Sequence, residues 1–192
     1  MARVPQVSSL DLLPPGLSAA DRHAAAEFIA AYEAYSPYFA ETGEMSNAWA
    51  MLNGSPAFAK AVLGLGDHIL HAMPWSIENV GTRELVIQTL ARDLRCGFLA
   101  FTHWHDPEKV ASIELFEWPS APLTDLERAV IRFTHESLAG GATDETHAEV
   151  AAAYGDRGVL ELTACIAYWS FWCIMINTLQ PDAEPRRGVE PG

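Results

Sequence analysis

The sequence predicts an all-α protein, a compact multi-helix domain. Apolar residues recur at helical spacing between residues that begin and end helices, and we find no two alternating strand patterns joined by a hairpin turn. Apolar residues make up 49% of the chain and charged residues 19%, so the chain can bury a core and is too apolar for a disordered protein. A length of 192 residues favours one domain.

Start and stop signals place the expected helices along the chain. Ser18 and Asp21 form a capping box, Thr124 and Glu127 form a second one, and Pro74 lies just beyond a predicted helix end. The expected helices cover about 18–35, 46–52, 56–71, 82–94, 96–105, 108–117, 124–139, 143–154 and 159–179. We expect Gly155 to end the eighth helix, and Pro37 to lie beyond the end of the first.

The chain divides into three predicted segments. Residues 1–17 are rich in proline and are expected to form an arm on the surface. Residues 18–181 are expected to form a single helical domain. Residues 182–192 are rich in proline, glycine and charge, which predicts a disordered tail.

Charge and composition limit the expected partners. The formal net charge is -13, and so acidic a surface repels phosphate backbones and anionic lipid heads. We therefore expect neither nucleic acid nor a membrane as a partner. Residues 159–179 are long enough to span a bilayer, but they carry Glu161 and Asn177, and no basic residue follows until Arg186. This pattern favours a buried core helix.

The N-terminal sequence and the cysteine count indicate a cytoplasmic protein. The first residues lack a charged stretch followed by an apolar run and a cleavage site. Three cysteines, an odd number, argue against a disulfide framework and for a reducing compartment.

The stretch from Arg83 to His103 contains the candidate catalytic residues. Glu84 and Cys96 are twelve positions apart, about 18 Å on one unbroken helix, so they can meet only if the chain turns near Arg95. Cys96 would then lie in the first turn of a new helix, where free backbone N–H groups and Arg95 favour a thiolate. His103 shares a helix face with Cys96 but lies about 10 Å along the axis, so Glu84 or a water would have to relay protons.

These residues resemble the core motif of the alkylhydroperoxidase D/carboxymuconolactone decarboxylase family. Glu84, Cys96 and His103 match the family's Glu, first Cys and His with the same spacing, while Leu99 occupies the position of its second Cys. Flanking segments also resemble the family, and the resemblance covers roughly 46–179. They are Ser55-Pro-Ala-Phe-Ala-Lys-Ala-Val-Leu63, Arg83-Glu-Leu-Val-Ile87, Leu123-Thr-Asp-Leu-Glu-Arg-Ala-Val-Ile-Arg-Phe133 and Gly158-Val-Leu-Glu-Leu-Thr-Ala164. The resemblance implies an all-helical fold and assembly into homo-oligomers.

The same resemblance implies one of two chemistries. Decarboxylase-like members perform cofactor-independent acid–base chemistry on small carboxylated or lactone substrates, here with Glu84 and His103 as acid and base and Cys96 polarising the substrate or acting as nucleophile. Peroxidase-like members reduce hydroperoxides with a cysteine pair. We expect the first chemistry, because a sulfenic acid on Cys96 has no local resolving thiol. Cys165 or Cys173 could supply one only if folding brings it next to Cys96.

The alternatives are a thiol-dependent alkyl hydroperoxide reductase with Cys96 as the peroxidatic residue, and a non-catalytic helical oligomer that binds a hydrophobic ligand. Trp104, His105 and His71 are candidate substrate-binding residues. We expect neither a cofactor nor a metal, because the two histidines of His103-Trp-His105 point to different faces of a helix.

Overall fold

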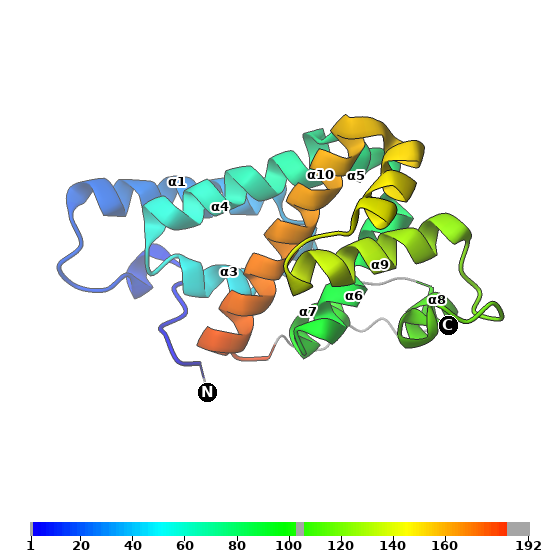
Figure 1. Ribbon diagram of the computed structural model, residues 1–192. Coiled ribbons are helices and arrows are strands. Elements are labelled where there is room, and N and C mark those ends of the chain that lie inside the picture. Colours follow the sequence, from blue (N-terminus) through cyan, green and yellow to red (C-terminus); the bar gives the residue numbers. More distant parts are fainter. Residues whose placement is uncertain (1, 103–105, 184–192) are drawn as a thin grey trace. The chain divides into compact units, whose positions relative to one another are not determined.

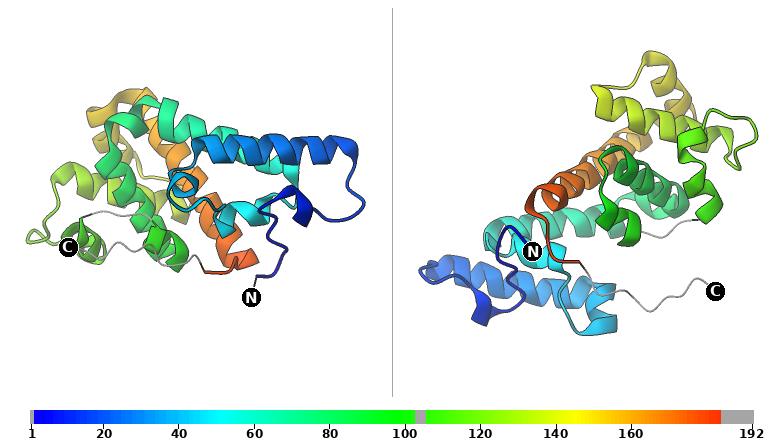
Figure 2. Two further views of the ribbon diagram at one scale, coloured as in Figure 1. Left: turned by 180° about the vertical axis from the view of Figure 1, so that it is seen from behind. Right: turned by 90° about the horizontal axis from the view of Figure 1, so that it is seen from below.

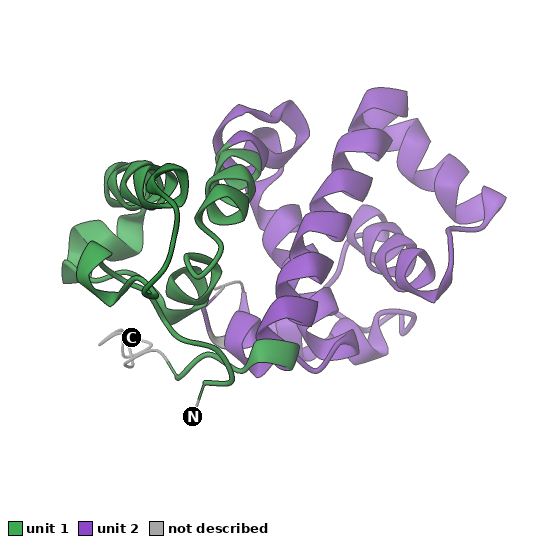
Figure 3. Ribbon diagram, turned by 90° about the vertical axis from the view of Figure 1, so that its left-hand side faces the viewer, with its two compact units in different colours: residues 1–67, 178–192 green, residues 68–177 purple. Residues whose placement is uncertain are grey.

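The computed structural model describes residues 2–102 and 106–183, apart from the side chain of Phe101. All regular elements within these ranges are helices, so the all-α prediction is confirmed. The chain forms two compact units (Figure 3). The first consists of Met1–Asp67 and Thr178–Gly192, and the second of His68–Asn177.

The first unit contains a short 3-10 helix and four α-helices. They are η1 (Leu10–Leu12), α1 (Ala19–Tyr35), α2 (Pro37–Thr42), α3 (Asn47–Leu52) and α4 (Pro56–Asp67). Helices α1 and α4 lie side by side (Figures 1 and 2). Pro37 lies beyond the end of α1, as predicted, and it also begins α2, because the Ser36 hydroxyl accepts a hydrogen bond from the Phe39 N–H and caps a new helix.

The first unit includes the N-terminal residues and the start of the C-terminal segment. Val7 is fully buried and its N–H donates to the Ala50 carbonyl at 2.8 Å. The Arg3 N–H donates to the Leu179 carbonyl at 2.9 Å. Both ends of the described chain are therefore anchored within this unit.

The second unit carries the residues of the predicted site. Its elements are a π-helix, η2 (His68–Ala72), then α5 (Pro74–Glu78), α6 (Val80–Asp93), α7 (Gly97–Thr102), α8 (Pro107–Ala111), the 3-10 helix η3 (Ile113–Leu115), α9 (Asp125–Ala139) and α10 (Asp144–Leu179), whose last two residues belong to the first unit. Helices α6 and α9 pack together (Figure 1). Leu85 and Ile131 from these helices form a buried cluster with Ile113 and Leu123.

Helix α10 consists of two helices that meet at Gly155. This glycine has φ 67° and ψ 174°, a conformation that only glycine adopts readily, so the predicted break at Gly155 is confirmed. α10 is also the one described helix that is long and apolar enough to cross a bilayer. In its most apolar window 56% is buried, and the core helix of a soluble protein meets the same criterion.

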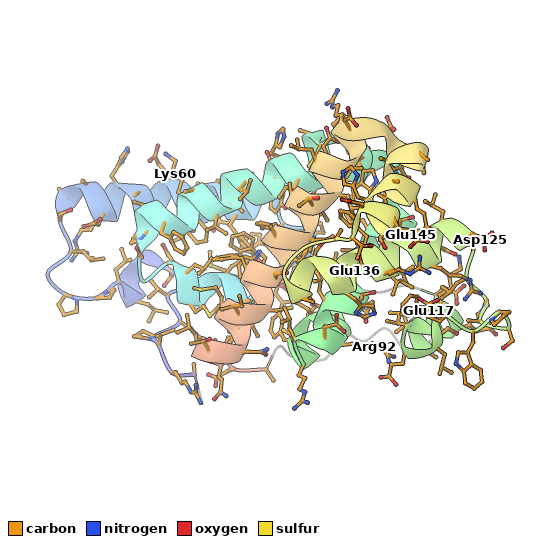
Figure 4. All side chains as sticks on the ribbon, in the orientation of Figure 1. Lys60, Arg92, Glu117, Asp125, Glu136 and Glu145 are labelled. Atoms are coloured by element: carbon orange, nitrogen blue, oxygen red, sulfur yellow. The ribbon has the colours of Figure 1, made fainter. Side chains whose placement is uncertain are left out.

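Ion pairs join neighbouring helices at the surface of each unit. In the first unit Lys60 of α4, which is labelled in Figure 4, lies 2.9 Å from Glu27 of α1. In the second, Arg132 of α9 bonds to Glu117 at 3.1 Å and to Glu149 at 2.9 Å. Because these charges face solvent, each pair contributes little to stability.

Candidate active site

The structure describes three of the six predicted site residues. Glu84 lies on α6, and Cys96 lies directly before α7. His71 lies on η2 and is exposed. His103, Trp104 and His105 lie outside the described residues, so their predicted roles stay predictions.

A tight turn between α6 and α7 places Cys96. The Arg95 N–H donates to the Arg92 carbonyl at 3.0 Å, and the Cys96 N–H donates to the Ala91 carbonyl at 2.7 Å. This pair of bonds is the Schellman motif that ends many helices. Arg95 takes the left-handed position, with φ 53°, where glycine is usual. The chain thus turns directly before Cys96, at the place where a turn near Arg95 was predicted.

The Cys96 sulfur caps the start of α7. It accepts hydrogen bonds from the backbone N–H groups of Phe98 and Leu99, which α7 leaves without carbonyl partners. Cys96 is fully buried. Leu99, at the position where the resembling family has its second cysteine, is also buried.

A second cysteine meets Cys96 from α10. The Cys173 thiol donates a hydrogen bond to the Cys96 sulfur, and Cys173 is also fully buried. This bond, together with those from Leu99 and Phe98, outweighs burial and lowers the pKa of Cys96 to about 7. The same bond, burial and the nearby Cys96 charge raise the pKa of Cys173 well above its ordinary value. At neutral pH Cys173 therefore remains a thiol beside a partly ionised Cys96.

Two side-chain amides hold this arrangement. Asn177 Nδ2 donates to the Leu94 carbonyl at 2.7 Å, and Gln88 Nε2 donates to the Ala100 carbonyl at 3.3 Å. Asn177 follows Cys173 by four residues, about one helical turn. α10 therefore binds both the Cys96 sulfur and the turn that carries Cys96.

Glu84 forms an ion pair with its neighbour Arg83 on α6. Its Oε1 accepts hydrogen bonds from Arg83 Nη2 at 3.2 Å and Nε at 3.3 Å, and both side chains are 13% exposed. Arg83 also donates to the hydroxyl of Ser76, which is buried. Both charges act on Cys165, whose pKa is raised to about 12, mainly by burial.

The three cysteines therefore fall into two environments. Cys165 precedes Cys173 by eight residues, about 12 Å along α10. The charges of Arg83 and Glu84 act on Cys165, whereas Cys173 acts on Cys96 by hydrogen bonding.

Sequence reasoning alone did not single out Cys173. It lies 77 positions from Cys96 within an aromatic-rich apolar helix, which is also the pattern of an inert core cysteine. Only the packing of α10 against the α6–α7 turn places the two sulfurs together. The available sequence signal was that no second cysteine lies near Cys96 in the sequence, so that a partner thiol would have to come from a distant segment.

No group of three or more potential metal ligands occurs within residues 2–102 and 106–183. The thiol pair and the Arg83–Glu84 pair are the candidate reactive groups among the described residues.

Comparison with known proteins leaves the family open. No family model, curated protein or solved structure matches this chain. The family resemblance stays a prediction from the residues that carry it.

Proposed function

We propose that the protein is a thiol-dependent hydroperoxide reductase in which Cys96 is the nucleophile. The observation that supports this most is the set of three hydrogen bonds to the Cys96 sulfur, from Cys173, Phe98 and Leu99. The lowered pKa of Cys96 increases the fraction of this residue that is thiolate at neutral pH. The thiolate is the reactive form of cysteine, and this ionisation suits attack on a peroxide.

The proposed reaction has one oxidation by the peroxide, followed by two reactions with thiols. The Cys96 thiolate attacks the terminal oxygen of a hydroperoxide, so that a sulfur–oxygen bond forms and the oxygen–oxygen bond breaks. The alkoxide leaves and takes up a proton to become an alcohol, while Cys96 becomes a sulfenic acid. A thiol then displaces the sulfenic oxygen as water, and a thiol reductant restores Cys96.

The burial of Cys96 limits the peroxides that can react. Cys96 is 0% exposed, so an oxidant must enter between α7 and its neighbours. A small hydroperoxide needs only a local opening of the six-residue α7, whereas a bulky one must displace the helix. We expect hydrogen peroxide to react faster than cumene hydroperoxide.

Peroxide consumption with excess dithiothreitol tests the proposal. We expect turnover that falls at least 100-fold in Cys96→Ser. Cys165→Ser is the matched control, because it removes a buried thiol of α10 that lies away from Cys96, and its rate should stay within twofold of wild type. Equal rates in Cys96→Ser and wild type, or equal oxidation of all three thiols, would contradict the proposal.

Acid–base chemistry on a small carboxylated or lactone substrate is the second candidate. The partly buried Arg83–Glu84 pair supports it, because Arg83 can bind a carboxylate while Glu84 transfers a proton. In this case a panel of lactones and carboxylic acids yields a turned-over compound, and Glu84→Gln abolishes its conversion without changing peroxide consumption. No conversion of any panel member by wild type would leave this candidate without support.

A further inference from the structure

We infer that Cys173 is the resolving thiol of Cys96, so that the two close an intramolecular disulfide which a dithiol reopens. This inference rests on the proposed function, which by itself leaves open the thiol that removes the sulfenic acid. It assigns that step to a residue of this chain, and it assigns the reductant to a chemical class.

The packing of α10 against the α6–α7 turn carries the inference. Asn177, one helical turn beyond Cys173, donates to the Leu94 carbonyl at 2.7 Å, two residues before Cys96, and both cysteines are fully buried. Cys173 is also the neighbour whose hydrogen bonding most affects the ionisation of Cys96. A disulfide brings two sulfurs to about 2.05 Å, so bond formation requires the two side chains to approach each other. Cys96 can supply this movement, because α7 is short and a left-handed residue, Arg95, precedes it.

Cys165 is the competing thiol, and its position excludes it from this step. It lies about 12 Å from Cys173 along α10. Its charged neighbours are Arg83 and Glu84, near the start of α6. Neither Cys96 nor Cys173 can reach it without unfolding part of the unit.

The atoms balance with the residues present. The Cys96 thiolate, the Cys173 thiol and a hydroperoxide become the Cys96–Cys173 disulfide, an alcohol and hydroxide, which takes a proton from solvent. The Cys173 proton leaves when its sulfur attacks the sulfenic sulfur of Cys96. Two electrons pass from the two sulfurs to the peroxide bond.

The burial of both sulfurs determines the class of reductant. Thiol exchange passes through a mixed disulfide between the reductant and a protein cysteine. With a monothiol, this intermediate is reduced only if a second monothiol molecule reaches the same buried sulfur. A dithiol releases it with its own second thiol, in an intramolecular step of high effective concentration. We expect dithiothreitol to reopen the disulfide at least tenfold faster than glutathione at equal thiol concentration.

Peptide mass spectrometry of the reduced wild-type protein tests the pairing without any substitution. One equivalent of hydrogen peroxide, followed by alkylation of the remaining thiols, should give a linked Cys96–Cys173 peptide and an alkylated Cys165. A parallel sample oxidised with diamide should give the same link. A different pairing, or a Cys96 that is not linked in either sample, would overturn the inference.

Variants then separate the inference from the proposed function. Cys173→Ser should let the Cys96 sulfenic acid accumulate, so that dimedone traps it, and should lower turnover with dithiothreitol at least tenfold. Cys165→Ser should behave as wild type in both measurements. Rapid oxidation of Cys96 with unchanged turnover in Cys173→Ser refutes the inference alone. A Cys96 that forms the diamide link but does not react with peroxide refutes the proposed function alone.

Discussion

At the scale of single residues, the ionisation of Cys96 depends on Cys173. The hydrogen bond from the Cys173 thiol is the largest influence on the Cys96 pKa, and it acts against burial. Two backbone N–H groups support the same charge from the start of α7. Cys173 therefore serves the reduced protein as a hydrogen-bond donor before any covalent step.

The first prediction concerns this ionisation. Because the lowered pKa is about 7, the thiolate fraction of Cys96 should rise as pH increases through about 7 and fall below it. Cys173→Ala removes the donor, so the midpoint should move upward toward the ordinary 9.0. The difference in thiolate absorbance near 240 nm between each protein and its Cys96→Ser counterpart measures the midpoint. The matched control, Cys165→Ser, should leave it unchanged, and an unchanged midpoint in Cys173→Ala would contradict the assignment.

A second prediction concerns Glu161, a buried carboxylate that joins α10 to α5. Its Oε2 accepts a hydrogen bond from the Trp75 N–H at 2.7 Å, and its Oε1 accepts one from Arg157 Nε at 2.7 Å. Burial raises the pKa of Glu161, but these bonds outweigh it and lower the pKa below 4.5. Glu161→Ala leaves a buried N–H without its acceptor and should lower the free energy of unfolding by about 1–3 kcal/mol.

Urea unfolding at two pH values measures this effect. Glu161→Gln keeps an oxygen for Trp75 and should lose less than Glu161→Ala, because Arg157 is mostly exposed. A lowered folded pKa means that the contribution is present above the unfolded pKa and is lost as pH falls through the folded one. The difference between wild type and Glu161→Ala should therefore shrink below about pH 4. Equal losses in both variants would refute the role of this acceptor.

Residue identities alone indicated part of the site. Cys96 could be chosen from the sequence, since Arg95 precedes it and Glu84 lies at a fixed spacing. Cys173 could not, because its role depends on a contact between residues 77 positions apart. Its local sequence is that of any core helix, and only the packing of α10 distinguishes it from Cys165.

At the scale of elements, caps determined how well helix bounds could be predicted. The capping box of Thr124 and Glu127 is present as expected, with both reciprocal bonds. Ser18 accepts from the Asp21 N–H and begins α1. The short helices α2 and α5 were not predicted. Each begins with proline, and a proline can mark either the end of one helix or the first turn of the next.

A third prediction tests the break in α10. Gly155 has φ 67° and ψ 174°, where a side chain is strained even though nothing lies within 4 Å of an added Cβ. Gly155→Ala should lower the free energy of unfolding by about 1–3 kcal/mol. Gly64→Ala is the matched control, because Gly64 lies in a helix with open space, and it should stabilise by about 0.5–1 kcal/mol. Thermal unfolding compares the two, and an equal melting temperature for both variants would contradict the strain at Gly155.

At the scale of the whole molecule, the first compact unit depends on contacts between distant parts of the chain. The Ala2 N–H donates to Asp182 Oδ1 at 3.0 Å, and Gln6 bonds to the same carboxylate at 2.9 Å. Local composition indicates neither of these contacts, because each joins residues from opposite ends of the sequence. The all-α class was predictable from local patterns, whereas the composition of the first unit from both chain ends was not.

The last prediction connects the thiol pair to the stability of the whole chain. A Cys96–Cys173 disulfide would close a long loop of the unfolded chain and reduce its conformational entropy. For a loop of nearly eighty residues the loop-entropy model gives about 4.5 kcal/mol of stabilisation, or roughly 10–15 °C in melting temperature. We expect the peroxide-oxidised protein to melt higher than the dithiothreitol-reduced protein by an amount of this order.

Scanning calorimetry of the two redox states makes the measurement. Cys173→Ser cannot form the bond and should melt at the same temperature before and after peroxide treatment, while Cys165→Ser should show the full wild-type shift. A lower melting temperature after oxidation of wild type would mean that the disulfide strains the α6–α7 turn. The free-energy cost of this strain would then exceed the stabilisation gained by restricting the unfolded chain. In that case the hydrogen-bonded dithiol, and not the disulfide, is the form in which α7 packs best against α10. The strained disulfide would then be a strong oxidant that readily returns to the dithiol.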